Sequence, residues 1–229
     1  MKPIASKRRA RRGFTLIELI IVMSLIAVLA GVLTPAVSSI MRSQARGATI
    51  QEMQLLAEAI QAYYRDTRQF PTAVTRLMSD TVPGWSGPYL SGTVDDPWSA
   101  QSGYVVDGYG NNYRLTPAAF DVTLGSDGPD RTAGNADDID LVVNVTPILR
   151  QLTLAELDVI NTAIVQYNAT FVSTNPLPAN WPVALSMLES RGYLPTGSGY
   201  GADEWGAAYV EVPTGTTPVT EVTSVNVGP

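Results

Sequence analysis

Residues 13–33 read GFTLIELIIVMSLIAVLAGVL. Within this stretch, Phe14 to Leu33 form a run of 20 residues in which Glu18 is the only ionisable side chain. An α-helix rises about 1.5 Å per residue, so a helix of this length spans roughly 30 Å, the thickness of the hydrocarbon core of a bilayer. The stretch therefore predicts one membrane-spanning helix.

Six basic residues and no acidic residue precede this run, namely Lys2, Lys7, Arg8, Arg9, Arg11 and Arg12. Basic flanks favour the cytoplasmic side of a membrane, so a cytoplasmic N-terminus is expected. A nucleic-acid-binding arm is the alternative for such a block. The remaining chain carries nine basic and 21 acidic residues, and its net charge of −12 disfavours contact with a phosphate backbone. We therefore expect a membrane partner and no nucleic acid.

A carboxylate inside a membrane helix costs a few kcal/mol, so Glu18 needs an explanation. Glu18 is either a protonated or snorkelling acid near the edge of the span, or it pairs with a positive group. Cleavage between Gly13 and Phe14 would create a new α-amino group four residues from Glu18. That amine could pair with Glu18 of the same chain or of a neighbouring subunit.

The motif GFTLIELI at residues 13–20, with the basic leader before it and the apolar run after it, resembles the processing motif of type IV prepilins and pseudopilins. The resemblance implies that residues 1–13 are a leader peptide. It implies that prepilin peptidase cuts after Gly13 and methylates Phe14. It also implies that Glu18 sets the register between subunits when their helices pack into a fibre.

Pro35 matches a helix-kinking proline that this family often carries, and its ring predicts a bend or a locally melted stretch. Beyond it, apolar residues recur at helical spacing, and we expect one long bent helix from Phe14 to about Arg65. Phe70-Pro71 is expected to lie beyond its end. The apolar stripe consists of Met53, Leu56, Ile60 and Tyr63.

The residues after this helix predict a head in which the helix stripe packs on a small antiparallel sheet. Candidate strands are separated by turns rich in Gly and Asp, and they cover residues 104–106, 112–115, 119–124 and 139–145. The expected fold class is α+β, with a long N-terminal transmembrane helix that continues into a pilin-type head.

The second half of the chain is predicted to repeat the first. At an offset of 104 residues, the window 49–64 shares five identities with 153–168, whereas chance gives about one. The alternative is that any two helices with apolar stripes look alike. On the duplication hypothesis the chain divides into a leader peptide (1–13), a transmembrane and assembly helix (14–36), a head with an acidic loop (37–149), and a truncated pilin-like repeat without a membrane span (150–229).

An acidic, glycine-rich loop separates two of the candidate strands. Its sequence, LGSDGPDRTAGNADDI at residues 124–139, places several carboxylates on about 15 residues, where they repel one another unless they are solvated or neutralised. Calcium binds six to eight oxygen ligands and tolerates irregular loops, although the spacing is not that of an EF-hand. From the residues alone, a solvated loop and a calcium loop remain equally open.

The resemblance favours calcium, because major pseudopilins of type II secretion carry LGADG, eight residues, and then ADI. On this match one calcium ion is expected, with Asp127 and Asp138 as side-chain ligands and Asp137 as a further candidate. Leu124 and Asn135 would contribute carbonyl oxygens. This chain differs from the family in having Arg131-Thr132 in place of Gly-Gly and an additional Asp130, which leaves the path of the loop open.

Composition excludes most catalytic sites, and we expect no enzyme activity. The chain has no Cys and no His, and its only lysines are Lys2 and Lys7. Disulfides, catalytic triads and Cys- or His-ligated zinc are therefore impossible. A carboxylate glycosidase is the remaining enzymatic alternative, but the adjacent acids Asp95-Asp96 and Asp203-Glu204 are typical of solvated turns.

Together these features predict a structural subunit of a periplasmic pseudopilus, closest to the major pseudopilin of type II secretion. The resemblance implies a homopolymer that also contacts prepilin peptidase, other pseudopilins and an inner-membrane assembly platform. The subunit would be single-pass in the inner membrane, with a periplasmic head, and would join a periplasmic fibre that drives protein export. The alternatives are a surface type IV pilus subunit or adhesin that displays residues 150–229, and a DNA-uptake pseudopilin.

Overall fold

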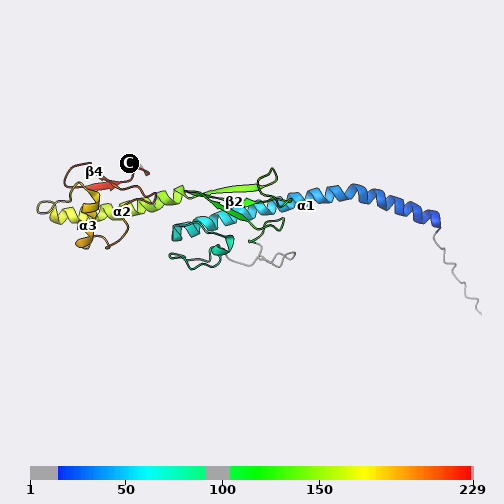
Figure 1. Cartoon of the computed structure of the whole chain (residues 1–229), viewed down its shortest axis with the longest axis horizontal. Helices are drawn as coiled ribbons and strands as arrows, with labels where there is room; N and C mark the ends of the chain where they lie inside the picture. The colour runs from blue at the N-terminus through cyan, green and yellow to red at the C-terminus, as the bar shows by residue number, and fades with distance from the viewer. Residues whose placement is uncertain (1–14, 91–103, 228–229) are drawn as a thin grey trace, which may run out of the picture.

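The computed structural model describes residues 15–90 and 104–227. Figure 1 shows an elongated molecule in which a long helix leads into a first head, and a second helix leads onward into a second unit. The predicted mixture of helix and small antiparallel sheet is confirmed. The elements are α1 (Leu16–Thr67), the 3-10 helix η1 (Val74–Leu77), β1 (Arg114–Pro117), β2 (Asp121–Ser126), β3 (Ile139–Asn144), α2 (Thr146–Phe171), α3 (Trp181–Ser190), β4 (Val210–Val212) and β5 (Glu221–Thr223).

Helix α1 is continuous over 52 residues, and its backbone stays helical through Pro35. Of the two predicted alternatives, a bend or a locally melted stretch, melting is therefore wrong. Figure 1 shows the N-terminal half of α1 curving gently. The helix begins and ends two residues later than predicted. It ends where Arg68 adopts a left-handed conformation and donates its backbone N–H to the carbonyl oxygen of Tyr64.

The apolar stripe predicted on the second half of α1 forms the core of the first head. Met53, Leu56, Ile60 and Tyr63 are each at most 2% exposed, and they pack with Val122, Leu124, Ile139 and Val143 from the sheet. Burial of each large apolar side chain contributes about 1.5–3 kcal/mol, which fixes the helix on the sheet.

The sheet of the first head has the antiparallel order β1-β2-β3. β3 lies where it was predicted, whereas β1 and β2 begin two residues later than predicted. The predicted strand at residues 104–106 is reduced to one bridge between Val106 and Asn112. The short turn between β1 and β2 is closed by a hydrogen bond from the N–H of Ala118 to the carbonyl oxygen of Asp121, 2.8 Å long.

The second unit consists of α2, α3 and the antiparallel pair β4-β5. Its core surrounds Tyr167 and Trp181, which are 0% and 1% exposed. Helix α2 begins at Thr146 and has a proline in its first turn. Helix α3 was not predicted, although Asn180 caps its N-terminus and accepts a hydrogen bond from the N–H of Val183.

In the first head, one buried aspartate organises the turn that precedes β1. Asp107 Oδ1 accepts the backbone N–H of Asn111 at 2.8 Å, and Asp107 Oδ2 accepts the hydroxyl of Ser126 at the end of β2. Thr49 of α1 holds the same turn against the helix, because its Oγ1 accepts the N–H of Gly108 at 2.9 Å.

In the second unit, Asp203 occupies the corresponding turn before β4. Asp203 Oδ1 accepts the backbone N–H of Ala207 at 2.8 Å, and Asp203 Oδ2 accepts the hydroxyl of Ser224, 2.6 Å away, just after β5. Thr153 of α2 accepts the N–H of Glu204 at 3.2 Å. The two units therefore use the same residue types and the same atoms to fasten the turn to the helix and the sheet.

Candidate functional site

Glu18 lies in the first turn of α1 and forms a capping box with Thr15. The backbone N–H and the hydroxyl of Thr15 each donate to Glu18 Oε2 at 2.9 Å, and the N–H of Glu18 donates to Thr15 Oγ1 at 3.3 Å. The carboxylate thus lies back over the positive end of the helix, which stabilises it. Gly13 and Phe14 lie outside the described residues, so the cut site stays a prediction.

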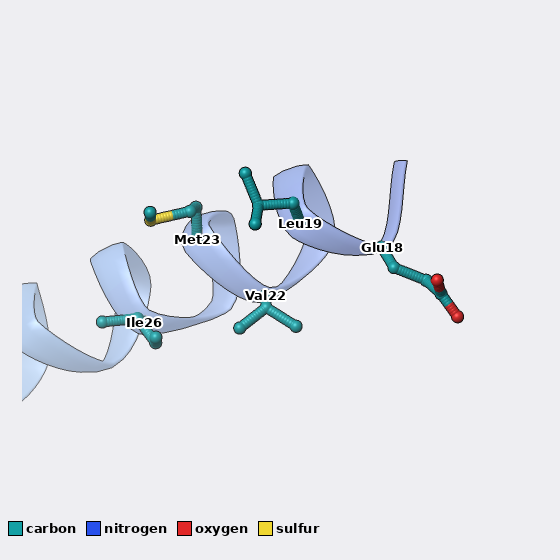
Figure 2. Close-up of a pocket in the computed structure, with 5 residues that line it drawn as sticks. All are labelled: Glu18, Leu19, Val22, Met23 and Ile26. Carbon is teal, nitrogen blue, oxygen red and sulfur yellow. The ribbon is translucent and has the colours of Figure 1, made fainter. Parts of the chain in front are cut away.

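The helix surface that follows Glu18 is apolar and exposed. A shallow groove is lined by Glu18, Leu19, Val22, Met23 and Ile26 (Figure 2). The exposed fractions of Leu19 and Met23 are 54% and 62%. An exposed apolar surface that continues along several helical turns is typical of a contact with protein or lipid. Within the residues that the structure describes, no helix is both long enough and apolar enough to cross a membrane.

The acidic loop connects β2 to β3, and its two ends lie close together. Gly128 has a φ of 63°, and a Cβ there would lie 2.6 Å from the carbonyl oxygen of Asp137. Only glycine permits this approach and this backbone conformation without strain. The side-chain amide of Asn111 donates to the carbonyl oxygen of Gly128 at 2.6 Å, which ties the loop to the turn before β1.

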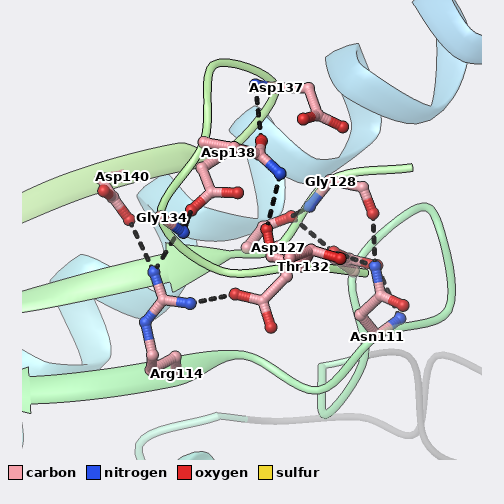
Figure 3. Close-up of polar contacts among 12 residues, drawn as sticks. Asn111, Arg114, Asp127, Gly128, Thr132, Gly134, Asp137, Asp138 and Asp140 are labelled. Carbon is pink, nitrogen blue, oxygen red and sulfur yellow. Dashed lines mark hydrogen bonds and ion pairs between the residues drawn. The ribbon is translucent and has the colours of Figure 1, made fainter. Parts of the chain in front are cut away.

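A guanidinium lies among the carboxylates of this loop (Figure 3). Arg114 of β1 forms an ion pair with Asp127, and its Nη2 lies 3.4 Å from Asp140 Oδ1 and 3.7 Å from Asp138 Oδ2. The sequence analysis missed Arg114, because it lies 13 residues before Asp127 in the chain and only the pairing of the strands brings it to the loop. The loop charge is therefore partly neutralised from within the chain.

The structure brings two of the predicted ligands, Asp127 and Asp138, to the same guanidinium. The side chain of Asp138 is only 7% exposed. Its Oδ2 accepts the N–H of Gly134 at 2.7 Å, whereas its Oδ1 is buried and has no hydrogen-bond partner. A buried carboxylate oxygen without a partner carries a desolvation cost that a bound cation would offset.

The other predicted ligands make contacts elsewhere in the loop or in the sheet. The side chain of Asn135 donates to Asp130 Oδ2 at 2.8 Å, inside the loop, and Asp137 lies beside Gly128. Leu124 lies within β2, in register with Leu115 and Leu141, rather than in the loop.

Over residues 15–90 and 104–227, no group of three or more acidic side chains is close enough to hold a metal ion. Asp127 and the unpaired oxygen of Asp138 do match the hard oxygen ligands that calcium prefers. These two carboxylates therefore supply oxygen ligands of the kind that calcium binds, and Arg114 is paired with one of them.

The chain matches two family models and several curated proteins. Residues 8–34 match the prokaryotic N-terminal methylation motif, and residues 37–144 match type II secretion system (T2SS), protein G. Type II secretion system core protein G of Xanthomonas campestris pv. campestris is 33% identical over 140 residues, which are 58% of this chain and 90% of that protein. The proteins of the same name from Escherichia coli and Pseudomonas aeruginosa are 29% and 28% identical, and the matches cover 89% and 96% of those proteins and 56% and 58% of this chain.

No solved structure matches the chain. The two family-model matches end at residues 34 and 144, so residues 145–229 lie beyond both of them. Proteins of the matched family are structural pseudopilin subunits and not enzymes, as expected from the composition. Because the match to the Xanthomonas protein covers 90% of that relative at 33% identity, and the methylation motif precedes it, the chain belongs to the family of type II secretion system protein G, the major pseudopilin.

Proposed function

We propose that this chain is cleaved between Gly13 and Phe14 and methylated by prepilin peptidase, and that it then polymerises through its N-terminal helix into a periplasmic pseudopilus. The methylation motif over residues 8–34 carries this proposal. The exposed apolar face of α1 beyond Glu18 supports it, because such a surface requires lipid before assembly and neighbouring helices afterwards.

In the proposed precursor, residues 14–36 anchor the subunit in the inner membrane, with the N-terminus in the cytoplasm and the head in the periplasm. The run of 20 residues in which Glu18 is the only ionisable side chain, and the basic residues before it, support this placement. In the fibre, Glu18 pairs with the Phe14 amine of the same or a neighbouring subunit. Growth from an inner-membrane platform, together with other pseudopilins, drives export.

The head is proposed to bind one calcium ion, with Asp127 and Asp138 as its side-chain ligands and Asp137 beside them. The buried, unpaired Oδ1 of Asp138 supports this site. Calcium would neutralise the loop and join its two ends, and thereby stiffen the head.

Residues 150–229 are proposed to be a truncated second copy of the pilin-type unit. Matching contacts support the duplication: the hydroxyl of Tyr113 donates to Glu52, and that of Tyr209 donates to Glu156, at 2.8 and 2.7 Å. The aromatic pairs Tyr63–Tyr89 and Tyr167–Tyr193 are also matched, with ring centroids 5.7 and 5.5 Å apart and both edge-on.

The test of this function is complementation of a strain that lacks the gene. The wild-type gene should restore export of periplasmic enzymes, with surface pili unaffected by the deletion. Gly13→Ala should leave an uncleaved precursor in the membrane and restore no export. Gly31→Ala is the matched control, because a Cβ there meets no atom within 4 Å, and it should be processed normally.

Mass spectrometry of the N-terminus and of the secreted proteins reads out both steps. Normal cleavage of the Gly13→Ala chain would refute the cut site. Loss of surface pili with export intact would instead assign the chain to a surface pilus.

A further inference from the structure

The register of the sheet places Arg114 beside the acidic loop. Arg114 on β1 lies opposite Gly125 on β2, and Gly125 lies opposite Asp140 on β3. A Cβ at Gly125 would lie 2.7 Å from Asp140 Oδ1 and 2.8 Å from Arg114 Nη2. The missing side chain in the central strand therefore leaves the space in which the arginine and the aspartate of the outer strands meet.

Arg114, Gly125 and Asp140 thus form one row across the three strands. From its place in this row, the Arg114 guanidinium also contacts both ends of the acidic loop. It pairs with Asp127, just after β2, and lies 3.7 Å from Asp138, just before β3. The Arg114 side chain is 35% exposed, and those of Asp127 and Asp138 are 27% and 7% exposed, so solvent screens the cluster only in part. The guanidinium of Arg114 thus interacts with a carboxylate at each end of the loop.

These two carboxylates are also the proposed side-chain ligands of calcium. The Asp127 oxygen that faces the guanidinium cannot coordinate a cation from the same side, and two positive centres that share the same carboxylates repel each other. Calcium therefore has to displace Arg114 from Asp127. Asp138 Oδ1, buried and without a hydrogen-bond partner, is available to a cation before any such displacement.

We propose that Arg114 is a built-in counter-ion that competes with calcium for Asp127 and Asp138 and so sets the calcium affinity of the head. Without calcium, the guanidinium neutralises the loop and keeps its two ends together. With calcium, the ion takes over Asp127 and Asp138, and the guanidinium retains Asp140. This inference rests on the proposed calcium site.

The test is calorimetric titration of calcium chloride into the full-length chain, purified in detergent and freed of metal with a chelator. The variant Arg114→Gln should bind calcium about tenfold more tightly than wild type, because the competing charge of a partly screened ion pair is gone. Arg131→Gln is the matched control. It removes one positive charge from the loop itself, and Arg131 forms no ion pair among the described residues. The calcium affinity of this variant should therefore stay within about twofold of wild type.

The melting temperature, measured with and without calcium, gives a second test. An arginine with only a structural role would affect it equally in both conditions. In chelator, Arg114→Gln should melt below wild type, and saturating calcium should remove the difference. An equal loss of melting temperature with and without calcium would overturn the competition.

The outcomes separate the two proposals. Equal or weaker calcium binding by Arg114→Gln, with clear binding by wild type, overturns the role of Arg114 and leaves the calcium site intact. Absence of binding in both chains overturns both. Adding Asp138→Asn to Arg114→Gln should abolish the tight binding, and full retention of affinity would place calcium elsewhere and also overturn the competition.

Discussion

Asp203 is the single residue on which the turn of the second unit depends most. Its carboxylate is 5% exposed and accepts hydrogen bonds from Ser224, Asn226 and the backbone N–H groups of Ala207 and Trp205. Burial opposes ionisation, but these donors outweigh it and lower the pKa of Asp203 below its ordinary value of 3.8. The charged form is therefore the one that stabilises the fold.

The second unit should lose stability in acid through Asp203. Since its pKa is lower in the folded chain, the unfolded chain takes up the proton first. The stabilisation is therefore present above the unfolded value of 3.8 and is lost as the pH falls from there through the lower pKa of the folded chain. Asp203→Asn should cost about 2 kcal/mol at pH 7, because charge-assisted hydrogen bonds are lost, and should flatten this pH dependence. Urea unfolding at pH 7 and at about pH 3 measures both effects. The exposed Asp158→Asn is the control, and an unchanged slope in Asp203→Asn would contradict the assignment.

The spacing of apolar residues predicted helix α1, because this spacing is a local property of the sequence. The contacts of Arg114 depend instead on how the strands pair, which no local pattern in the sequence shows. The spacing of Met53, Leu56 and Ile60 is a property of one helix, and all three are buried as predicted. The row that joins Arg114 to Asp140 spans three strands, so its register depends on two turns. The first of these turns, between β1 and β2, contains Ala118 and no Gly or Asn, which explains why both strands were placed two residues early.

At the scale of elements, the two sheets differ at one edge. In the first head β2 is paired with β1 and β3, whereas β5 is paired with β4 alone among the described strands. On the other side of β5, Asn161 of α2 takes the place of a strand. Its Nδ2 donates to the carbonyl oxygen of Val222 at 3.1 Å, and its Oδ1 accepts the N–H of Val222 at 2.8 Å.

Removal of this side-chain amide should both destabilise the second unit and expose its edge. Asn161→Ala leaves a backbone donor and acceptor of Val222 without partners, at a cost of about 1–3 kcal/mol. An uncovered edge strand also pairs readily with other chains. We expect a lower melting temperature and concentration-dependent association in light scattering, with Asn161→Asp intermediate because it keeps only the acceptor. Thr162→Ala, at an exposed neighbouring position, should resemble wild type. A fully stable, monodisperse Asn161→Ala would show that the amide is dispensable.

At the scale of the whole molecule, the first head and the second unit meet where α1 ends and α2 begins (Figure 1). A small apolar cluster lies there, with Leu149 at 1% exposure. Beside it, the Nε of Arg68 donates to both carboxylate oxygens of Glu204 at 2.9 and 3.0 Å. The cluster contains Tyr64, Val145, Ile148 and Leu149, with Phe70, Leu152 and Trp205 packed against it.

The free energies expected for the ion pair and for the apolar cluster indicate which of them joins the two units more strongly. Arg68 is 41% exposed, so its ion pair with Glu204 contributes about 1 kcal/mol or less. Truncation of a buried leucine such as Leu149 costs about 2–5 kcal/mol. In calorimetry, the wild-type chain should unfold in one transition, Leu149→Ala should split it into two, and Arg68→Gln should shift it by only a few degrees. If Arg68→Gln separated the units and Leu149→Ala did not, the ion pair and not the apolar cluster would be the element that joins them.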